Sequence, residues 1–320
     1  MSLIEKAAQR LDQLKQASAE PGDEPAQTIL AQAPLKPKAA EGVAAEAKDF
    51  SKSSEVPLSV PQTQSATVSR TVHIDLDMLA NKGMVTPEQP RSSIAEEFRV
   101  IKRPLLRNAT DVGPARIDNA NLIMVTSAMP GEGKTFSAIN LAISMAMELD
   151  YTVLLVDADV SRPSVFRQLG LPPERGLMDV LAGDVTDLSD VLLRTNIEKL
   201  SILPAGMPHQ RATELLASEN MNRLLKQIAS RYSDRIVVFD SPPLLVTTES
   251  RVLATHMGQI VLVVESERTT HSSVKQALAT IESCPIKLMM LNKSRHSGPG
   301  SYYGYGYGYG YGEKPRENAA

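Results

Sequence analysis

Apolar residues fall into short runs separated by amphipathic stretches from residue 121 onward. The runs are Leu122–Thr126, Val153–Val156, Leu200–Leu203, Ile236–Phe239, Ile260–Val264 and Ile286–Leu291. Helical periodicity lies between most of them, notably in Phe136–Leu149, Ala212–Ser230 and Ser272–Ser283. Near-continuous apolar strands that alternate with helices are typical of a mostly parallel sheet covered by helices on both faces. The pattern therefore predicts one α/β domain over residues 117–293.

A helical segment over residues 71–116 is predicted to precede this domain. Ile74–Asn81 has the pattern of a short helix ended by Gly83. Ser93–Glu96 forms a capping box that opens a second helix, which continues through Lys102. Pro104 lacks a backbone N–H, so we expect it to end or kink this helix.

The two ends of the chain have different patterns. Residues 1–18 are predicted to form an amphipathic helix, opened by the capping box Ser2–Glu5. Residues 19–70 are rich in Ala, Pro, Ser, Glu and Gln and have few large apolar side chains, which predicts a disordered linker. Residues 294–320 are polar and Gly-rich and are predicted to form a flexible tail.

Composition narrows the class of protein. The net charge of −3 gives no reason to expect nucleic acid as a partner. Cys284 is the single cysteine, which excludes an internal disulfide and favours a reducing compartment. The longest apolar run is too short to cross a bilayer, and the first residues do not resemble an export signal. We expect a cytoplasmic protein that reaches a membrane only through a partner.

The segment Ala128–Thr135, with the sequence AMPGEGKT, matches the phosphate-loop pattern with Ala in place of the first Gly. Its glycines would let backbone N–H groups converge on phosphate oxygens, at the start of a helix. Lys134 would bridge the β- and γ-phosphates of ATP, and the Thr135 hydroxyl would bind Mg²⁺. The predicted nucleotide contacts are Pro130, Gly131, Glu132, Gly133, Lys134, Thr135 and Phe136. A glycine-rich turn that binds nothing would not require this Lys and Thr.

Three aspartates follow apolar strands, at the edge where the phosphate loop is expected. Asp157 and Asp159 follow the strand at Val153–Val156, and Asp240 follows the strand at Ile236–Phe239. Ligands of open parallel sheets bind at the carboxyl ends of the strands. We expect Asp240 to hold Mg²⁺, Asp159 to support the metal, and Asp157 to face the attacking hydroxyl. The alternative is that strand-end aspartates cap the helices that follow them.

Together, the phosphate loop, the Asp157-Ala158-Asp159 strand end and the Asp240-Ser241-Pro242-Pro243 strand end resemble the bacterial tyrosine kinases. These are P-loop proteins of the Min/Par ATPase superfamily. The resemblance spans residues 91–293, with Lys134, Asp157, Asp159 and Asp240 at the catalytic positions. The segment that opens with Asp157 and the first helix look most like the autokinases of exopolysaccharide loci linked to exosortase.

The resemblance also implies subunit contacts and partners. The family's Glu-x-x-Arg-x-x-Arg contact motif is matched by Glu96, Arg99 and Lys102, with Lys in the last place. Its second acidic motif places an Arg where this chain has Ser161, so Arg162 is the candidate phosphate or neighbour contact. The implied partners are sister subunits, with a ring as one arrangement of them, a membrane-anchored polysaccharide chain-length regulator that activates the kinase, and a tyrosine phosphatase.

The tail concentrates the tyrosines of the chain. Six of the eight lie there, alternating mostly with glycine: Tyr302, Tyr303, Tyr305, Tyr307, Tyr309 and Tyr311. Next to an ATP site, such tyrosines are predicted to be phosphoacceptors that enter the site of a neighbouring subunit. Two alternatives stay open: a Min/Par-type ATPase switch without protein phosphorylation, and an ATP-binding adaptor with a sticky tail.

Overall fold

A computed structural model describes residues 70–294 except 111, 112, 114, 115 and 232–234. The predicted helix at 1–18, the linker at 19–70 (except Arg70) and almost all of the tail, including its tyrosines, lie outside the described residues. In the described part, no helix combines the length and apolarity needed to cross a membrane.

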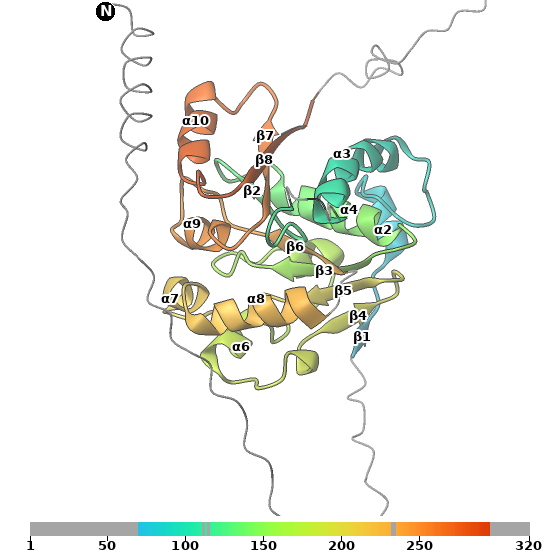
Figure 1. Ribbon diagram of the computed structural model, residues 1–320. Coiled ribbons are helices and arrows are strands. Elements are labelled where there is room, and N and C mark those ends of the chain that lie inside the picture. The colour runs from blue at the N-terminus through green and yellow to red at the C-terminus, as the bar shows by residue number, and fades with distance from the viewer. Residues whose placement is uncertain (1–69, 111–112, 114–115, 232–234, 295–320) are drawn as a thin grey trace, which may run out of the picture. The chain divides into compact units, whose positions relative to one another are not determined.

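The centre of the described part is an eight-stranded sheet in the order β1-β4-β5-β3-β6-β2-β7-β8 (Figure 1). The strands are β1 (Thr71–Val72), β2 (Leu122–Ser127), β3 (Thr152–Asp157), β4 (Leu193–Thr195), β5 (Leu200–Leu203), β6 (Arg235–Asp240), β7 (Gln259–Glu265) and β8 (Ile286–Asn292). All neighbours pair in parallel except β4 with β5. The predicted α/β fold is confirmed, and each of the six predicted strands is present within one or two residues of its expected bounds.

The helices cover both faces of the sheet. They are α2 (Leu76–Asn81), α3 (Ser93–Thr110), α4 (Lys134–Ala146), α5 (Val165–Leu169), α6 (Leu177–Ala182), α7 (Ala212–Leu216), α8 (Glu219–Arg231), α9 (Glu249–Ala254) and α10 (His271–Ala279), with a 3-10 turn η1 (Leu188–Asp190). One apolar cluster joins the sheet to α2–α5, and the other joins the opposite face to α6–α10. Figure 1 shows α3 and α4 on one side of the strands and α6 and α8 on the other.

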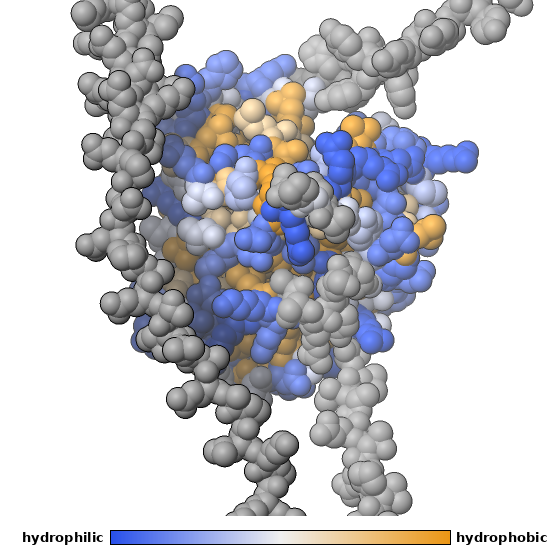
Figure 2. All heavy atoms as spheres, viewed as in Figure 1, coloured by the Kyte–Doolittle hydropathy of each residue, from blue (hydrophilic) through white to orange (hydrophobic). Residues whose placement is uncertain are grey.

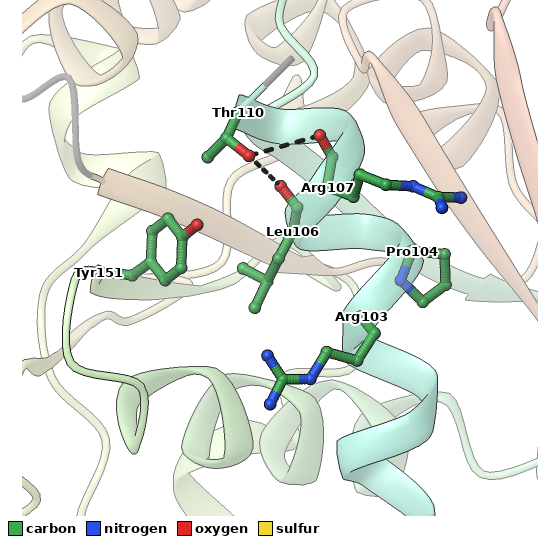
Figure 3. Close-up of a pocket in the computed structure, with 6 residues that line it drawn as sticks. All are labelled: Arg103, Pro104, Leu106, Arg107, Thr110 and Tyr151. Carbon is green, nitrogen blue, oxygen red and sulfur yellow. Dashed lines mark hydrogen bonds between the residues drawn. The ribbon is translucent and has the colours of Figure 1, made fainter.

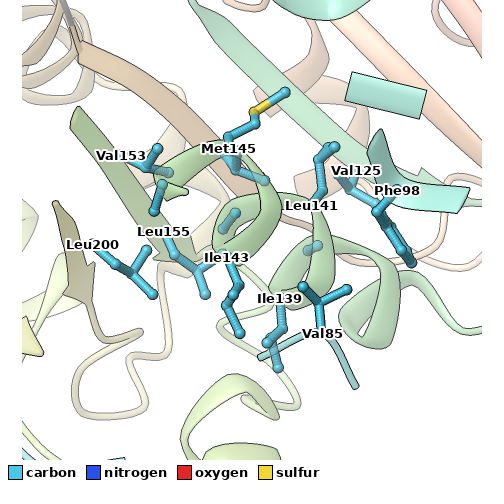
Figure 4. Close-up of a cluster of buried hydrophobic side chains, with 14 of the residues drawn as sticks. Val85, Phe98, Val125, Ile139, Leu141, Ile143, Met145, Val153, Leu155 and Leu200 are labelled. Atoms are coloured by element: carbon cyan, nitrogen blue, oxygen red, sulfur yellow. The ribbon is translucent and has the colours of Figure 1, made fainter. Parts of the chain in front are cut away.

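Helix α4 is the most deeply packed helix, because it lies between the sheet and α3. Ile139, Leu141, Ile143 and Met145 are all at most 2% exposed, and Figure 4 shows them packed beside side chains of β2, β3 and α3. Burial of this kind contributes roughly 1.5–3 kcal/mol per large apolar side chain. The first turn of α4 is therefore held by a rigid element, which is what a phosphate site requires.

Two helix predictions need correction. Of the two outcomes expected at Pro104, an end of the helix is wrong, because α3 continues past it to Thr110. Pro104 has no N–H to donate to the Val100 carbonyl, and Val100 is 67% exposed. Leu105 and Leu106 are buried and hold the second half of the helix in place. The predicted helix Ala212–Ser230 is instead two helices.

That break occurs at Ala217 and Ser218. The Ser218 hydroxyl oxygen accepts a hydrogen bond from the Met221 N–H at 3.4 Å, and the same hydroxyl donates to the Leu215 carbonyl at 2.7 Å. A serine that bonds the backbone on both sides competes with helix continuation and starts α8 anew. The hydrogen bonds of Ser218 therefore divide the helix, although the apolar periodicity continues through this segment.

The surface is mainly hydrophilic, with isolated apolar side chains, as the face in Figure 2 shows. Within the described part, the large apolar side chains with the greatest exposure are Leu149, Val100, Met289 and Leu291. Met289 and Leu291 lie on β8, one of the two edge strands of the sheet.

Candidate nucleotide-binding site

The predicted phosphate loop joins β2 to α4. Gly131 and Gly133 have φ angles of 87° and 96°, in the left-handed region that favours glycine. Helix α4 begins at Lys134, two residues earlier than expected, so Gly133 is its N-cap. The unpaired N–H groups of the first turn and the positive end of the helix dipole meet at the loop, as an anion site requires.

The strand ends bring the predicted carboxylates to the loop. Asp157 and Asp240 are paired across β3 and β6, and Asp240 is also in register with Val125 of β2. The Lys134 ammonium nitrogen lies 2.6 Å from Asp159 Oδ2 and 3.7 Å from Asp240 Oδ1. The structure therefore gathers Lys134 and three aspartates around one point at the carboxyl edge of the sheet.

Asp240 has an incomplete set of partners. Its side chain is 0% exposed, and neither carboxylate oxygen has a hydrogen-bond partner among the described residues. Burial raises its pKa to about 6, while the Lys134 ammonium pulls in the opposite direction. A buried carboxylate without donors carries a free-energy cost, and a hard cation such as Mg²⁺ would remove it. This donor chemistry fits the predicted metal ion.

Asp157 is bonded to the backbone of its own loop. Oδ2 accepts the N–H groups of Ser164 and Val165 at 3.1 and 3.0 Å, and Oδ1 accepts the N–H of Asp159 at 3.3 Å. With these contacts Asp157 caps the start of α5, which is the alternative role that the sequence left open. Burial and the neighbouring Asp240 nevertheless raise the pKa of Asp157 to about 7.

Asp159 and Thr135 connect the segment after β3 to the phosphate loop. Asp159 Oδ1 accepts the backbone N–H of Arg162 at 3.1 Å, while its Oδ2 holds Lys134. The Thr135 hydroxyl lies 2.9 Å from the Ser164 hydroxyl. Ser164 is a site residue that was not predicted from the sequence. It lies seven residues after Asp157, in the segment that follows the acidic strand end. The Arg162 side chain is exposed.

The charge balance explains the state of Lys134. Burial lowers the pKa of its ammonium, but Asp240 and Asp159 outweigh that effect and raise it. One ammonium faces three carboxylates, so the cluster has an excess of negative charge when all of them are ionised. Lys134 therefore occupies the region where the metal ion and terminal phosphate are expected.

The remaining predicted loop residues have different positions. Pro130 is exposed and Phe136 is half-buried. The Glu132 side chain is 3% exposed, and its carboxylate accepts hydrogen bonds from the Met129 N–H and from the Thr269 hydroxyl. Thr269 and Asn292, whose side chain contacts the loop, were not predicted from the sequence. Asn292 ends a strand, so the rule that selected the aspartates could have selected it too.

The predicted contact face on α3 does not include all three of its residues. Glu96 and Arg99 form a partly exposed ion pair with each other. Lys102 is 4% exposed, and its ammonium lies 2.8 Å from Glu148 Oε1 and bonds the Ser144 carbonyl of α4. Lys102 was implied as a subunit contact together with Glu96 and Arg99, but its ammonium is engaged by partners inside the subunit.

A hollow of about 440 Å³ lies beside the second half of α3 (Figure 3). Its lining includes Arg103, Leu106, Arg107 and Tyr151, and Tyr151 directly precedes β3. It therefore lies at the amino ends of the strands, opposite the phosphate loop, and is separate from the nucleotide site.

Comparison with known proteins gives consistent matches. A family model described as an AAA domain matches residues 120–293. Tyrosine-protein kinase YwqD of Bacillus subtilis is 32% identical over 229 residues, which cover 70% of this chain and 92% of the relative. The putative tyrosine-protein kinase CapB of Staphylococcus aureus is 27% identical over 232 residues, covering 71% of this chain and 97% of that protein. The kinase domain of the Escherichia coli tyrosine kinase ETK aligns with a TM-score of 0.57 at 26% identity, over 75% of this chain and 89% of that one.

Proposed function

Because the chain belongs to the bacterial tyrosine kinase family, we propose that it is an ATP-dependent protein-tyrosine autokinase. Its acceptors are the tail tyrosines Tyr302, Tyr303, Tyr305, Tyr307, Tyr309 and Tyr311 of neighbouring subunits. The observation that carries this proposal is the cluster of Lys134, Asp159 and Asp240 at the phosphate loop.

Binding of Mg-ATP would redistribute the contacts of Lys134. The ammonium would leave Asp159 and Asp240, which now hold it, and would bind the terminal phosphate oxygens instead. Asp240, Asp159 and the Thr135 hydroxyl would hold Mg²⁺, directly or through water. The metal ion would supply positive charge that neutralises the phosphate oxygens during transfer. The buried oxygens of Asp240 support this assignment, because neither has a hydrogen bond in the described part and the Lys134 ammonium is 3.7 Å away.

Phosphoryl transfer requires that the acceptor hydroxyl lose its proton. We assign the proton to Oδ1 of Asp157, which has the longest of that residue's backbone contacts, 3.3 Å. The tyrosine oxygen bonds to the γ-phosphorus, the bond from that phosphorus to the bridging oxygen breaks, and ADP leaves with the electron pair. A pKa near 7 suits a group that takes a proton at neutral pH and then releases it.

The family suggests the setting of this activity. We propose that the protein is cytoplasmic and peripheral to the inner membrane. There it would assemble with its own copies through Glu96 and Arg99, and respond to a membrane-anchored chain-length regulator of exopolysaccharide synthesis or export. A tyrosine phosphatase would reset the tail. Several phosphates on one tail would repel one another and loosen an assembly in which tails occupy neighbouring sites.

The test is phosphorylation by the purified full chain with labelled ATP and Mg²⁺. Lys134→Ala and a chain truncated after Ser301 are run beside it, each also with the wild-type chain as a partner. The expected result is tail phosphotyrosine in the intact chain, none in Lys134→Ala alone, and labelling of the Lys134→Ala tail by the wild type.

Three results would contradict this proposal. ATP hydrolysis without phosphotyrosine would favour the ATPase switch, and ATP binding without either reaction would favour the adaptor. Phosphotyrosine labelling that persists in Lys134→Ala alone would show that the phosphate loop does not carry out the reaction.

A further inference from the structure

We propose that Asn292, Lys293 and Thr269 are positioning residues that hold the phosphate loop in its anion-binding form, from β8 and from the segment after β7. This inference rests on the proposed binding of nucleotide at the loop. The three residues lie between 137 and 162 positions along the sequence from the loop residues that they contact.

Two of these residues bond loop carbonyls. The Asn292 side-chain amide donates to the Glu132 carbonyl at 2.9 Å, and the Lys293 ammonium donates to the Gly131 carbonyl at 2.7 Å. In a planar trans peptide the carbonyl and the N–H point in opposite directions. A donor that holds the Glu132 carbonyl on the β8 side therefore turns the Gly133 N–H to the other side. The Lys293 contact does the same for the Glu132 N–H.

The loop needs such contacts because its glycines allow many backbone conformations. Gly131 and Gly133 flank the two peptides, and glycine readily adopts the conformations that a peptide flip requires. A flipped peptide would present a carbonyl oxygen to phosphate instead of an N–H. Asn292 also packs closely on the loop, since a Cβ added to Gly133 would lie 2.1 Å from its amide nitrogen.

Thr269 acts through the Glu132 side chain. Its hydroxyl donates to one carboxylate oxygen, and the Met129 N–H donates to the other at 2.9 Å. The carboxylate thus closes the loop on itself and is tied to the segment between β7 and α10. Both of its oxygens are engaged by protein donors, so we assign this side chain to loop geometry and not to nucleotide contact.

Lys293 is itself oriented by a second carboxylate. Its ammonium lies 3.1 Å from Glu265 Oε1, at the end of β7. The Ser266 N–H donates to the Asn292 carbonyl at 2.9 Å, which fixes the end of β8 against the same segment. The ends of the last two strands therefore form one support for the loop, at the point where the tail begins.

The experiment measures binding of Mg-ADP by calorimetry to the full chain and its variants. Asn292→Asp keeps the size of the side chain but replaces the donor by an acceptor, and Thr269→Val removes the hydroxyl. Each is expected to weaken Mg-ADP binding about three- to tenfold, as loss of one hydrogen bond predicts. Thr269→Ser keeps the hydroxyl and should bind like the wild type.

Matched controls separate positioning from general destabilisation. Thr255→Val and Asn222→Asp make the same changes at α9 and α8, where the side chains bond only local groups in their own helices, and they should bind Mg-ADP normally. Equal Mg-ADP affinity in Asn292→Asp, Thr269→Val and wild type would overturn the proposal. So would a Thr269→Ser protein as weak as Thr269→Val, or affinity losses that follow the melting temperature across all variants. Because ADP binding needs no transfer step, the result holds whether or not the kinase proposal does.

Discussion

Two buried lysines in this protein have opposite environments. Lys102 lies between α3 and α4, where its ammonium meets Glu148 and the Ser144 carbonyl. Lys134 lies at the phosphate loop, where its ammonium meets Asp159 and Asp240. Burial lowers the pKa of Lys102, and its carboxylate partner only partly offsets that effect. At Lys134 the carboxylates outweigh burial, and the pKa is raised.

The difference distinguishes a structural charge from a functional one. At Lys102, one cation faces one nearby carboxylate, and the ammonium has a further acceptor, so the group is satisfied within the subunit. At Lys134, acceptors exceed donors, and the two buried oxygens of Asp240 have no hydrogen-bond partner among the described residues, although Oδ1 lies 3.7 Å from the Lys134 ammonium. The free-energy cost of this buried negative charge is removed when a cation and a phosphate bind.

The largest expected effect comes from making the same change at both lysines. Lys134→Met should lower the rate of tyrosine phosphorylation by about 10²–10³-fold or more, because a charge that stabilises the transferring phosphoryl group is lost. Lys102→Met should leave the rate per folded molecule unchanged. Initial rates of autophosphorylation, corrected for the folded fraction, provide the measurement. Similar losses of rate in both variants would show that Lys134 is no more specific to the reaction than Lys102.

Asp240→Asn should separate activity from stability. Its expected loss of phosphorylation is about 10²-fold, since the amide cannot replace an ionised metal ligand. Without nucleotide, however, the variant should be more stable than the wild type at pH 8, on the order of 1–2 kcal/mol, because the buried charge is gone. Urea unfolding without Mg²⁺ measures the gain. A less stable apo variant would show that Asp240 is a structural ion-pair partner.

Lys102→Met tests the structural half of the comparison. Removing the ammonium leaves Glu148 with only the longer contact to Arg103, 3.5 Å, and we expect a loss of about 1–3 kcal/mol in the free energy of unfolding. Adding Glu148→Gln should recover part of that loss, because no unpaired charge remains. The same urea experiment checks both. No loss in the single variant would mean that the buried ammonium contributes nothing to stability.

The sequence predicted this fold well where the hydrophobic pattern is strong. Each of the six long strands has a near-continuous apolar run, and the phosphate loop has its own residue pattern, so both could be located without coordinates. The short strands β1 and β4 and the helices α5 and α6 have two to six residues, too few to establish a period. Their formation depends on contacts with the sheet.

The site was predictable to the extent that it follows from strand ends. Asp157, Asp159 and Asp240 meet because parallel strands end at one edge. Lys102 was misplaced because a lysine at a helix surface is almost always exposed, and the sequence gives no sign of its contact with α4. Asn292 also ends a strand, but an amide is not a residue type that marks an acid–base or phosphoryl-transfer site, and its contact with the loop joins residues 160 positions apart. Pairing of that kind is set by the fold and not by local pattern.

The smallest expected effect is a pH dependence that belongs to the functional cluster alone. The pKa of Asp157 is raised to about 7 in the folded protein, above its value near 4 in an unfolded chain, so the neutral form persists through mildly acidic pH. The apo protein therefore loses stability as pH rises through about 7, and binding of a cation gains because it meets the ionised form. Affinity for Mg-ADP should rise between pH 6 and pH 8.

The nucleotide also titrates in this range, and Asp157→Asn controls for it because the variant keeps the nucleotide's own proton equilibrium. The ratio of wild-type to variant affinity should rise by up to about tenfold between pH 6 and pH 8. Calorimetry at both pH values gives that ratio. If the ratio stays constant, Asp157 holds a single protonation state throughout, because its backbone hydrogen bonds then dominate over burial. Its role at the site would in that case be the capping of its own loop.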